Sequence, residues 1–139
     1  MALNKVLIDT NVCLDAAKRR QPFAESAIKI LAYSESQEIE GYVAAHSFDT
    51  IFYFLEENYG RSRAYDALKG LRKAVKICPV TQQVIDAAFD LEWNDFEDAI
   101  HHESALQIGC DAIITRNEKD FKKTKIPVLS PGKFLDHLN

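Results

Sequence analysis

Short apolar runs alternate with segments of helical periodicity along the whole chain. We interpret the runs as strands, at residues 5–8, 42–45, 75–80, 113–115 and 128–129. Between them apolar residues recur three or four positions apart, which predicts helices over residues 11–18, 22–33, 47–59, 61–72, 82–91 and 95–109, and from residue 131 onward. Strands that alternate with helices through short connections favour a parallel sheet between helical layers. We therefore expect an α/β fold, a three-layer α/β/α sandwich with a central mostly parallel sheet, in one domain over residues 1–139.

Four helix ends carry residues that suit them. Pro22 is favourable in the first turn of the second predicted helix, and Gly60 ends the third. Thr81 is a suitable N-cap for the fifth predicted helix, and Asn94 or Asp95 for the sixth. The sixth helix therefore begins in a cluster of polar and acidic residues.

Composition narrows the classes of function. The net charge is −4 and the pI is near 5.5, which argues against a protein that holds nucleic acid on a broad basic surface. The three cysteines are odd in number and lie in apolar segments, a pattern that fits neither a disulfide framework nor a zinc site. The chain shows no basic leader and no apolar run of membrane-spanning length. We expect a cytoplasmic protein that is not bound to a membrane.

Acidic residues gather where the predicted elements would bring them together. Asp9 directly follows the first strand, and ligands of open parallel sheets bind at the carboxyl ends of strands. Asp95 and Asp98 are three positions apart, so both project from one side of a first helical turn. Residues 86–111 contain eight acids and no Lys or Arg. Each acid alone could merely cap a helix, but a cluster without basic neighbours needs a counter-charge, and a divalent metal ion is the commonest one.

Three stretches of the chain resemble the motifs of PIN-domain proteins, in the same order. They are DTNVCLD at residues 9–15, DFEDA at 95–99 and ITRNEKDF at 114–121. The resemblance is to bacterial PIN domains of the kind found in toxin–antitoxin ribonucleases. It implies an α/β/α fold and a metal-dependent endoribonuclease that cleaves single-stranded RNA. It also implies an antitoxin protein as a partner and assembly into a homodimer.

The resemblance further implies a set of site residues. Mg²⁺ or Mn²⁺ would be held by the matching acids, which are Asp9, Asp98 and Asp120. Neighbouring residues would orient these carboxylates or a metal-bound water, namely Thr10, Asn11, Thr115 and Asn117. Hard oxygen ligands favour Mg²⁺ or Mn²⁺ over zinc. A metal pair about 4 Å apart could supply hydroxide and neutralise the charge that builds on the phosphate.

One position departs from the PIN pattern. These domains usually place a Glu early in the helix after the second strand, where this chain has Thr50. Asp49 could substitute after a local register change, although it lies about 100° away around the helix. Asp95 could supply the missing charge instead, because its spacing from Asp98 permits it. We count Asp95 among the candidate catalytic acids and Asp49 among the supporting residues.

Histidines and one arginine lie close to these motifs. His102 is four residues beyond Asp98 and could share its helical face, yet we interpret both His101 and His102 as partly exposed or locally hydrogen-bonded residues. We interpret His46 as structural. Arg116 is a candidate for contact with an RNA backbone.

Two alternative functions stay open at this point. A phosphoacceptor domain of receiver type also gathers acids and Mg²⁺ at strand ends. It expects paired acids in the first turn and a Lys after a late strand, which residues 9–11 and 115–117 fit poorly. A non-catalytic PIN-like module that binds RNA or protein is the other alternative, and Thr50 motivates it.

Overall fold

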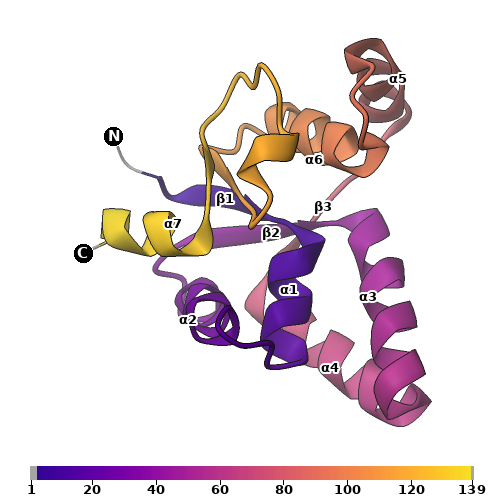
Figure 1. Ribbon diagram of the computed structural model, residues 1–139, viewed down its shortest axis with the longest axis vertical. Coiled ribbons are helices and arrows are strands. Elements are labelled where there is room, and N and C mark those ends of the chain that lie inside the picture. Colours follow the sequence, from indigo (N-terminus) through magenta and orange to yellow (C-terminus); the bar gives the residue numbers. More distant parts are fainter. Residues whose placement is uncertain (1–2, 139) are drawn as a thin grey trace.

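The computed structural model describes residues 3–138, and its centre is a five-stranded sheet (Figure 1). The strands are β1 (Lys5–Ile8), β2 (Glu40–Ala44), β3 (Lys76–Cys78), β4 (Ala112–Ile114) and β5 (Val128–Leu129). They lie in the order β3-β2-β1-β4-β5, and every neighbouring pair is parallel. A receiver domain has the strand order 2-1-3-4-5. The phosphoacceptor alternative is therefore wrong.

Helices cover both faces of the sheet. They are α1 (Thr10–Ala17), α2 (Ala24–Glu35), α3 (Ala45–Tyr59), α4 (Arg61–Ala74), α5 (Gln82–Leu91), α6 (Phe96–Gln107) and α7 (Pro131–Leu138), with a short 3-10 helix η1 (Glu118–Asp120). In Figure 1, α5 and α6 lie on one side of the strands and α1 to α4 on the other. The predicted three-layer α/β/α sandwich with a parallel sheet is confirmed.

Alternation along β1 explains the two layers. Val6 and Ile8 are fully buried in a core shared with the helices of the α1 to α4 side and α7. Leu7 points to the opposite face, where it packs with Ile113 of β4 and Ala105 of α6. Because successive side chains of a strand point to opposite faces, the three apolar residues of β1 suffice to anchor helices on both sides of the sheet.

Several element boundaries differ from the prediction. β2 begins at Glu40, two residues early, because the Glu40 amide donates to Asn4 O at 2.8 Å and joins β2 to the edge of β1. α2 begins at Ala24 rather than at Pro22, since a turn in which the Phe23 amide bonds Arg20 O at 2.9 Å precedes it. β3 is limited to three residues. The first two ends depend on backbone hydrogen bonds, one across the sheet and one in a turn, which periodicity does not report.

Two predicted N-caps are confirmed. Thr81 Oγ1 accepts a hydrogen bond from the Val84 amide at 3.2 Å at the start of α5. Asp95 Oδ1 accepts one from the Asp98 amide at 3.2 Å at the start of α6. Each bond satisfies a donor that the helix itself leaves free, so these residues fix where α5 and α6 begin.

The cysteines lie inside the protein. Cys13, Cys78 and Cys110 are all free and buried. Burial raises the pKa of Cys78 to about 11 and that of Cys110 to about 12, so both thiols are protonated at neutral pH. Across residues 3–138, no helix combines the length and the apolar character needed to cross a lipid bilayer.

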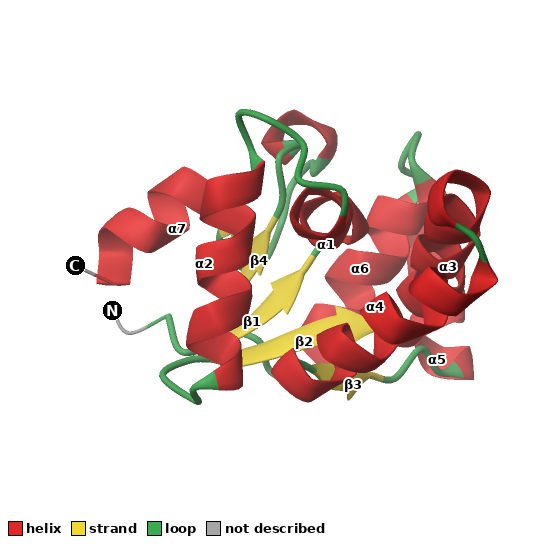
Figure 2. Cartoon of the chain, turned by 90° about the horizontal axis from the view of Figure 1, so that it is seen from below, coloured by secondary structure: helices red, strands yellow, loops and turns green. Residues whose placement is uncertain are grey.

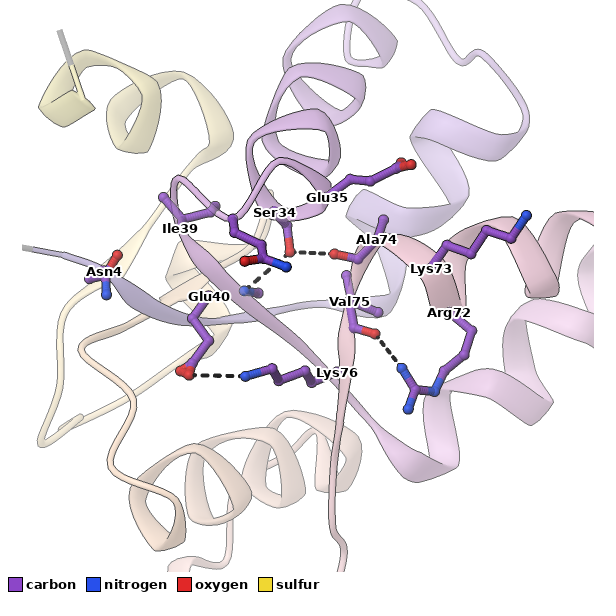
Figure 3. A pocket seen from close by; sticks show the side chains of 12 residues that line it. Asn4, Ser34, Glu35, Ile39, Glu40, Arg72, Lys73, Ala74, Val75 and Lys76 are labelled. Carbon is purple, nitrogen blue, oxygen red and sulfur yellow. Dashed lines mark hydrogen bonds and ion pairs between the residues drawn. The ribbon is translucent and has the colours of Figure 1, made fainter.

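A polar pocket of about 420 Å³ lies at the amino ends of the strands (Figure 3). Ser34 on α2 donates to Ala74 O at 2.5 Å and accepts from the Gly41 amide at 3.2 Å. Lys76 lies 3.4 Å from Glu40 across the same pocket. These bonds tie α2 to β2 and to the end of α4, at the edge of the sheet opposite to Asp9.

Candidate functional site

The carboxyl ends of β1 and β4 meet at one edge of the sheet, and polar residues follow both strands there. Asp9 comes directly after β1, and its amide donates to Ile114 O at 2.9 Å. Thr115 comes directly after β4, and its hydroxyl donates to Asp9 Oδ2 at 2.6 Å. Both side chains are buried. The Asp9 carboxylate is therefore held in place by the neighbouring strand.

The first turn of α6 brings a second carboxylate to this edge. Figure 2 shows α1, α3 and α6 gathered beyond the arrowheads of β1 and β2, and α6 contacts β1 directly. Asp98 is only 3% exposed, whereas Asp95 is exposed at the helix start and uses its carboxylate as the N-cap. The predicted pair thus divides: Asp98 points inward and Asp95 lies at the rim.

His101 completes a cluster with the two acids. One side-chain ligand atom from each of Asp9, Asp98 and His101 lies within 4.8 Å of the others. His101 Nδ1 is 3.3 Å from Asp9 Oδ1 and 3.9 Å from Asp98 Oδ1, and the ring is fully buried. Within residues 3–138, this is the one group of three or more His, Cys, Asp or Glu side chains close enough to share a metal ion.

Hydroxyl groups from α1 and α3 hold the far side of the His101 ring. Ser47 Oγ lies 3.2 Å from His101 Nε2 and accepts a hydrogen bond from the Thr10 hydroxyl at 2.7 Å. Ser47 is fully buried. Because Ser47 stands in the first turn of α3, this helix reaches the cluster through a hydroxyl group.

The charges of the cluster perturb its titration. Burial raises the pKa of Asp98, an effect that Asp9 reinforces and His101 opposes. Burial by itself would lower the pKa of His101, but the carboxylates of Asp98, Asp9 and Glu97 outweigh it and raise that pKa above its ordinary value. Two neighbouring buried carboxylates stabilise the charged form of any cation that lies close to them.

His46 and Glu97 lie at the margin of the cluster. The His46 ring is 5.0 Å from the His101 ring, and its Nε2 is 3.8 Å from Glu97 Oε2. Burial, together with the neighbouring His101, lowers the pKa of His46 to about 4, so His46 is neutral at pH 7. Burial raises the pKa of Glu97, with Asp9, Asp95 and Asp98 adding to the shift. Glu97 therefore belongs to the same group of charges.

Other predicted site residues lie further out. Asp49 and Asp120 are exposed, on α3 and η1 respectively, and neither belongs to the three-residue group. Asn117 is exposed too, and its amide donates to Thr115 Oγ1 at 3.0 Å. Asn11 is half-buried on α1, and within residues 3–138 its Oδ1 has no hydrogen-bond partner.

The histidine interpretation is correct in part: local hydrogen bonding is present for His102, but partial exposure is wrong for both residues. His101 and His102 are both buried, not partly exposed. His102 Nδ1 lies 2.7 Å from Glu103, and its Nε2 accepts from the Lys125 amide at 3.1 Å, so His102 anchors the loop before β5. His101 is the residue that reaches the acids. The sequence indicates this position only through spacing: His101 is three residues after Asp98, as Asp98 is after Asp95, so all three can lie on one side of the helix.

Arg116 is occupied by an ion pair. Its Nε and one terminal nitrogen donate to the two carboxylate oxygens of Asp15, at 2.5 and 3.1 Å. Its guanidinium carbon lies 4.1 Å from the centre of the Phe23 ring. Arg116 therefore joins the loop after β4 to α1, which reduces its availability for an RNA backbone.

Solved structures with a similar fold include toxin–antitoxin complexes and a toxin from bacteria. A toxin–antitoxin complex from Klebsiella pneumoniae is 22% identical, with a TM-score of 0.68 over 91% of this chain and 97% of that chain. The DNA-bound VapBC of Salmonella typhimurium is 15% identical, with a TM-score of 0.71 over 92% and 98%. VapC20 of Mycobacterium tuberculosis, described as a sarcin-ricin loop cleaving toxin, is 16% identical, with a TM-score of 0.63 over 78% and 86%. At these identities, the likeness shows the fold.

A comparison with family models assigns the chain to a protein family. No curated protein matches the chain. A family model described as a PIN domain matches residues 5–119, which include β1 with Asp9, the first turn of α6 with Asp98, and the end of β4 with Thr115. Since this match extends over most of the sequence, the chain belongs to the PIN-domain family.

Proposed function

We propose that this protein is a metal-dependent endoribonuclease that hydrolyses phosphodiester bonds in single-stranded RNA. The observation that carries the proposal is the burial of Asp9 and Asp98 side by side at the carboxyl edge of the sheet. Within residues 3–138, Asp98 Oδ2 is buried without a hydrogen-bond partner. Buried polar atoms are normally paired, and two carboxylates with a free oxygen suit a divalent cation. The site therefore fits the metal ion that the resemblance implies.

Each residue of the site has a definite task in this proposal. Asp9 and Asp98 hold the divalent ion. Thr115 donates to Asp9 Oδ2, which leaves Oδ1 directed toward the cluster. A divalent ion bound there supplies a water of lowered pKa and positive charge beside the phosphate. Glu97 adds negative charge at the margin, on the same first turn of α6.

The proposal includes three further acids at the rim of the site. Asp120 lies on η1, after β4, and in this proposal it acts on a second ion together with the substrate. Asp95 could act through its charge, although its carboxylate serves as the α6 cap. Asp95→Ser keeps a capping oxygen and removes the charge, so it separates the two roles. Asp49 and Asp120 are tested by the corresponding Asn variants.

The surroundings of the acids suit a nucleic-acid substrate. The segment after Thr115 is basic and exposed, with Lys119, Lys122, Lys123 and Lys125. By contrast, residues 86–111 contain no Lys or Arg, so the stretch that carries Asp98 offers no cation to a phosphate. Lysines that contact phosphates give salt-dependent binding. The description of VapC20 as a sarcin-ricin loop cleaving toxin supports RNA over DNA.

The test is a cleavage assay with matched variants. Purified protein is incubated with a mixed pool of single-stranded RNA, or DNA of the same sequences, with Mg²⁺, Mn²⁺ or EDTA. We expect RNA cleavage that needs a metal ion and is lost in Asp9→Asn and Asp98→Asn. Asp90→Asn, which makes the same charge change at an exposed position of α5, should retain it. Circular dichroism checks that each variant is folded.

Two results would contradict the proposal. Full activity of Asp9→Asn would remove Asp9 from the site. The second is a folded wild-type protein that binds RNA but cleaves none of the pool with either ion. This result would favour a non-catalytic PIN-like module, the alternative suggested by Thr50 at the usual Glu position.

The biological role that we propose is the toxin of a toxin–antitoxin pair in the cytoplasm, with an antitoxin protein as partner and a homodimer as the active form. Support comes from the similar structures from Klebsiella pneumoniae and Salmonella typhimurium. The free, buried cysteines suit a reducing compartment. Induced expression should arrest bacterial growth with wild-type protein and not with Asp9→Asn. Equal growth of both strains, at equal protein levels, would contradict the toxin role while leaving the nuclease proposal intact.

A further inference from the structure

His101 presents an unsatisfied nitrogen to the two acids. Its ring is fully buried, and within residues 3–138 Nδ1 has no partner that meets hydrogen-bond geometry. The nearest polar atoms are Asp9 Oδ1 at 3.3 Å and Asp98 Oδ1 at 3.9 Å. Asp98 Oδ2 is unpartnered as well. Two orphaned buried atoms in one cluster point to a shared ligand.

The distances suit three atoms around one ion. Ligands about 2.1 Å from an octahedral ion lie about 3 Å apart when adjacent and about 4 Å apart when opposite. The separations from His101 Nδ1, 3.3 Å to Asp9 Oδ1 and 3.9 Å to Asp98 Oδ1, lie within this range, and one ligand atom from each of the three residues lies within 4.8 Å of the others. Because Asp98 and His101 are one helical turn apart on α6, the helix sets their spacing.

Ser47 is the hydrogen-bond partner of the other ring nitrogen of His101. Its Oγ lies 3.2 Å from His101 Nε2 and can accept a hydrogen bond from it. Metal-binding histidines donate their second N–H to such an acceptor, which fixes the tautomer and turns the lone pair of the first nitrogen to the ion. A hydroxyl has two lone pairs, so Ser47 can accept from Thr10 and from His101 together.

We propose that His101 is, through Nδ1, a nitrogen ligand of the divalent ion held by Asp9 and Asp98, with Ser47 as its positioning residue, and that this makes the site prefer a transition ion such as Mn²⁺ to Mg²⁺. The inference rests on the metal site of the proposed function. Imidazole suits first-row transition ions, whereas Mg²⁺ is bound by oxygen ligands. A site of oxygens alone would not discriminate in this way.

The test uses Mn²⁺ alone as the probe and does not need RNA. Electron spin echo spectroscopy of the Mn²⁺-loaded full chain detects a directly bound nitrogen. We expect nitrogen coupling to Mn²⁺ in wild-type protein. When histidine is labelled with ¹⁵N, the ¹⁴N coupling should be replaced by ¹⁵N coupling. The coupling should be lost in His101→Gln. His46→Gln and the surface control His137→Gln should keep it, since His137 is exposed on α7. The labelled wild-type protein keeps the test valid if His101→Gln fails to fold.

Binding measurements give a second readout. In His101→Gln, Mn²⁺ affinity should fall by at least about ten-fold, and Mg²⁺ should displace Mn²⁺ at a lower ratio than in wild-type protein. Ser47→Ala should weaken Mn²⁺ binding by about ten-fold while keeping the nitrogen coupling. An unchanged Mn²⁺ affinity in His101→Gln would overturn the inference.

Spectroscopy and cleavage can fail independently. Bound Mn²⁺ without nitrogen coupling, or with coupling that persists in His101→Gln, overturns the His101 assignment even when RNA is cleaved. Failure of wild-type protein to bind Mn²⁺ overturns it too. Nitrogen coupling in a protein that cleaves no RNA supports the assignment and contradicts the nuclease proposal.

Discussion

The ion pair between Asp15 and Arg116 gives the sharpest prediction about stability. Asp15 lies on α1, and Arg116 follows Thr115, the residue that holds Asp9. The Asp15 side chain is 1% exposed and that of Arg116 is 25% exposed. Arg20 is the second cation, at 3.7 Å from Asp15. The pair therefore clamps the two chain segments that carry Asp9 and Thr115.

The two single variants should differ in cost. Arg116→Met keeps the aliphatic length but leaves the buried Asp15 carboxylate with Arg20 as its remaining charged partner. Breaking a fully buried pair costs about 3–5 kcal/mol, and the partial exposure of Arg116 together with Arg20 reduces this to about 2–3 kcal/mol. Asp15→Asn removes the buried charge, keeps an acceptor oxygen and leaves a guanidinium that can turn to water. Its cost should be about 1–2 kcal/mol.

Urea unfolding in EDTA measures these costs without a contribution from metal binding. The double variant Asp15→Asn/Arg116→Met should lose less than the sum of the singles, with a coupling of about 1–3 kcal/mol. Arg63→Met, an exposed arginine of α4, is the matched control and should change stability by less than about 0.5 kcal/mol. Additive losses, or Arg116→Met no costlier than this control, would refute the reasoning.

Three further predictions concern other parts of the fold. Gly41→Ala should destabilise the protein by about 1–3 kcal/mol in urea unfolding, because the added Cβ would lie 2.4 Å from Ser34 Oγ; wild-type stability would contradict this packing. Cys78 and Cys110, with pKa values raised to about 11 and 12 by burial, should resist Ellman's reagent at pH 8 in native protein and react once it is unfolded. Rapid native reaction would contradict their burial. Asp111→Ala should cost about 1 kcal/mol, since Asp111 Oδ2 accepts the Asn4 and Lys5 amides at 3.0 and 2.9 Å; no loss in urea unfolding would show these bonds to be dispensable.

The sequence predicts most of the fold because its elements are marked locally. Strand runs such as residues 5–8 and helix ends such as Thr81 and Asp95 carry their own signals in side-chain type and spacing. The start of β2 at Glu40 carries none, since that residue is polar and joins the sheet through a backbone bond to Asn4. Backbone pairing across the sheet depends on tertiary structure. The apolar pattern therefore predicts the start of this strand two residues too late.

The sequence also predicts the acids of the candidate site, but not its histidine. Asp9 and Asp98 come together as expected, because a strand end and a helix first turn have fixed positions in a parallel sheet. The spacing does not single out His101, because either His101 or His102 can accompany Asp98 on the helix. The choice depends on how α6 is rotated against the sheet, and packing of Trp93 beside His102, with ring centres 5.2 Å apart, turns that residue away from the acids.

The helix that departs from the PIN pattern also carries the hydrogen-bond partner of His101. The third helix has Thr50 where PIN domains usually have a Glu, so α3 brings no carboxylate to the cluster from that position. It brings Ser47 instead, and Ser47 lies 3.2 Å from Nε2 of His101, the imidazole that faces Asp9 and Asp98. A carboxylate from α3 would add negative charge to a buried pair of acids, whereas a hydroxyl can orient a neutral nitrogen ligand without adding any. In the arrangement that we propose, α3 therefore supports the nitrogen ligand through Ser47 rather than through a third acid, and Thr50→Glu should not restore the Mn²⁺ affinity that His101→Gln loses.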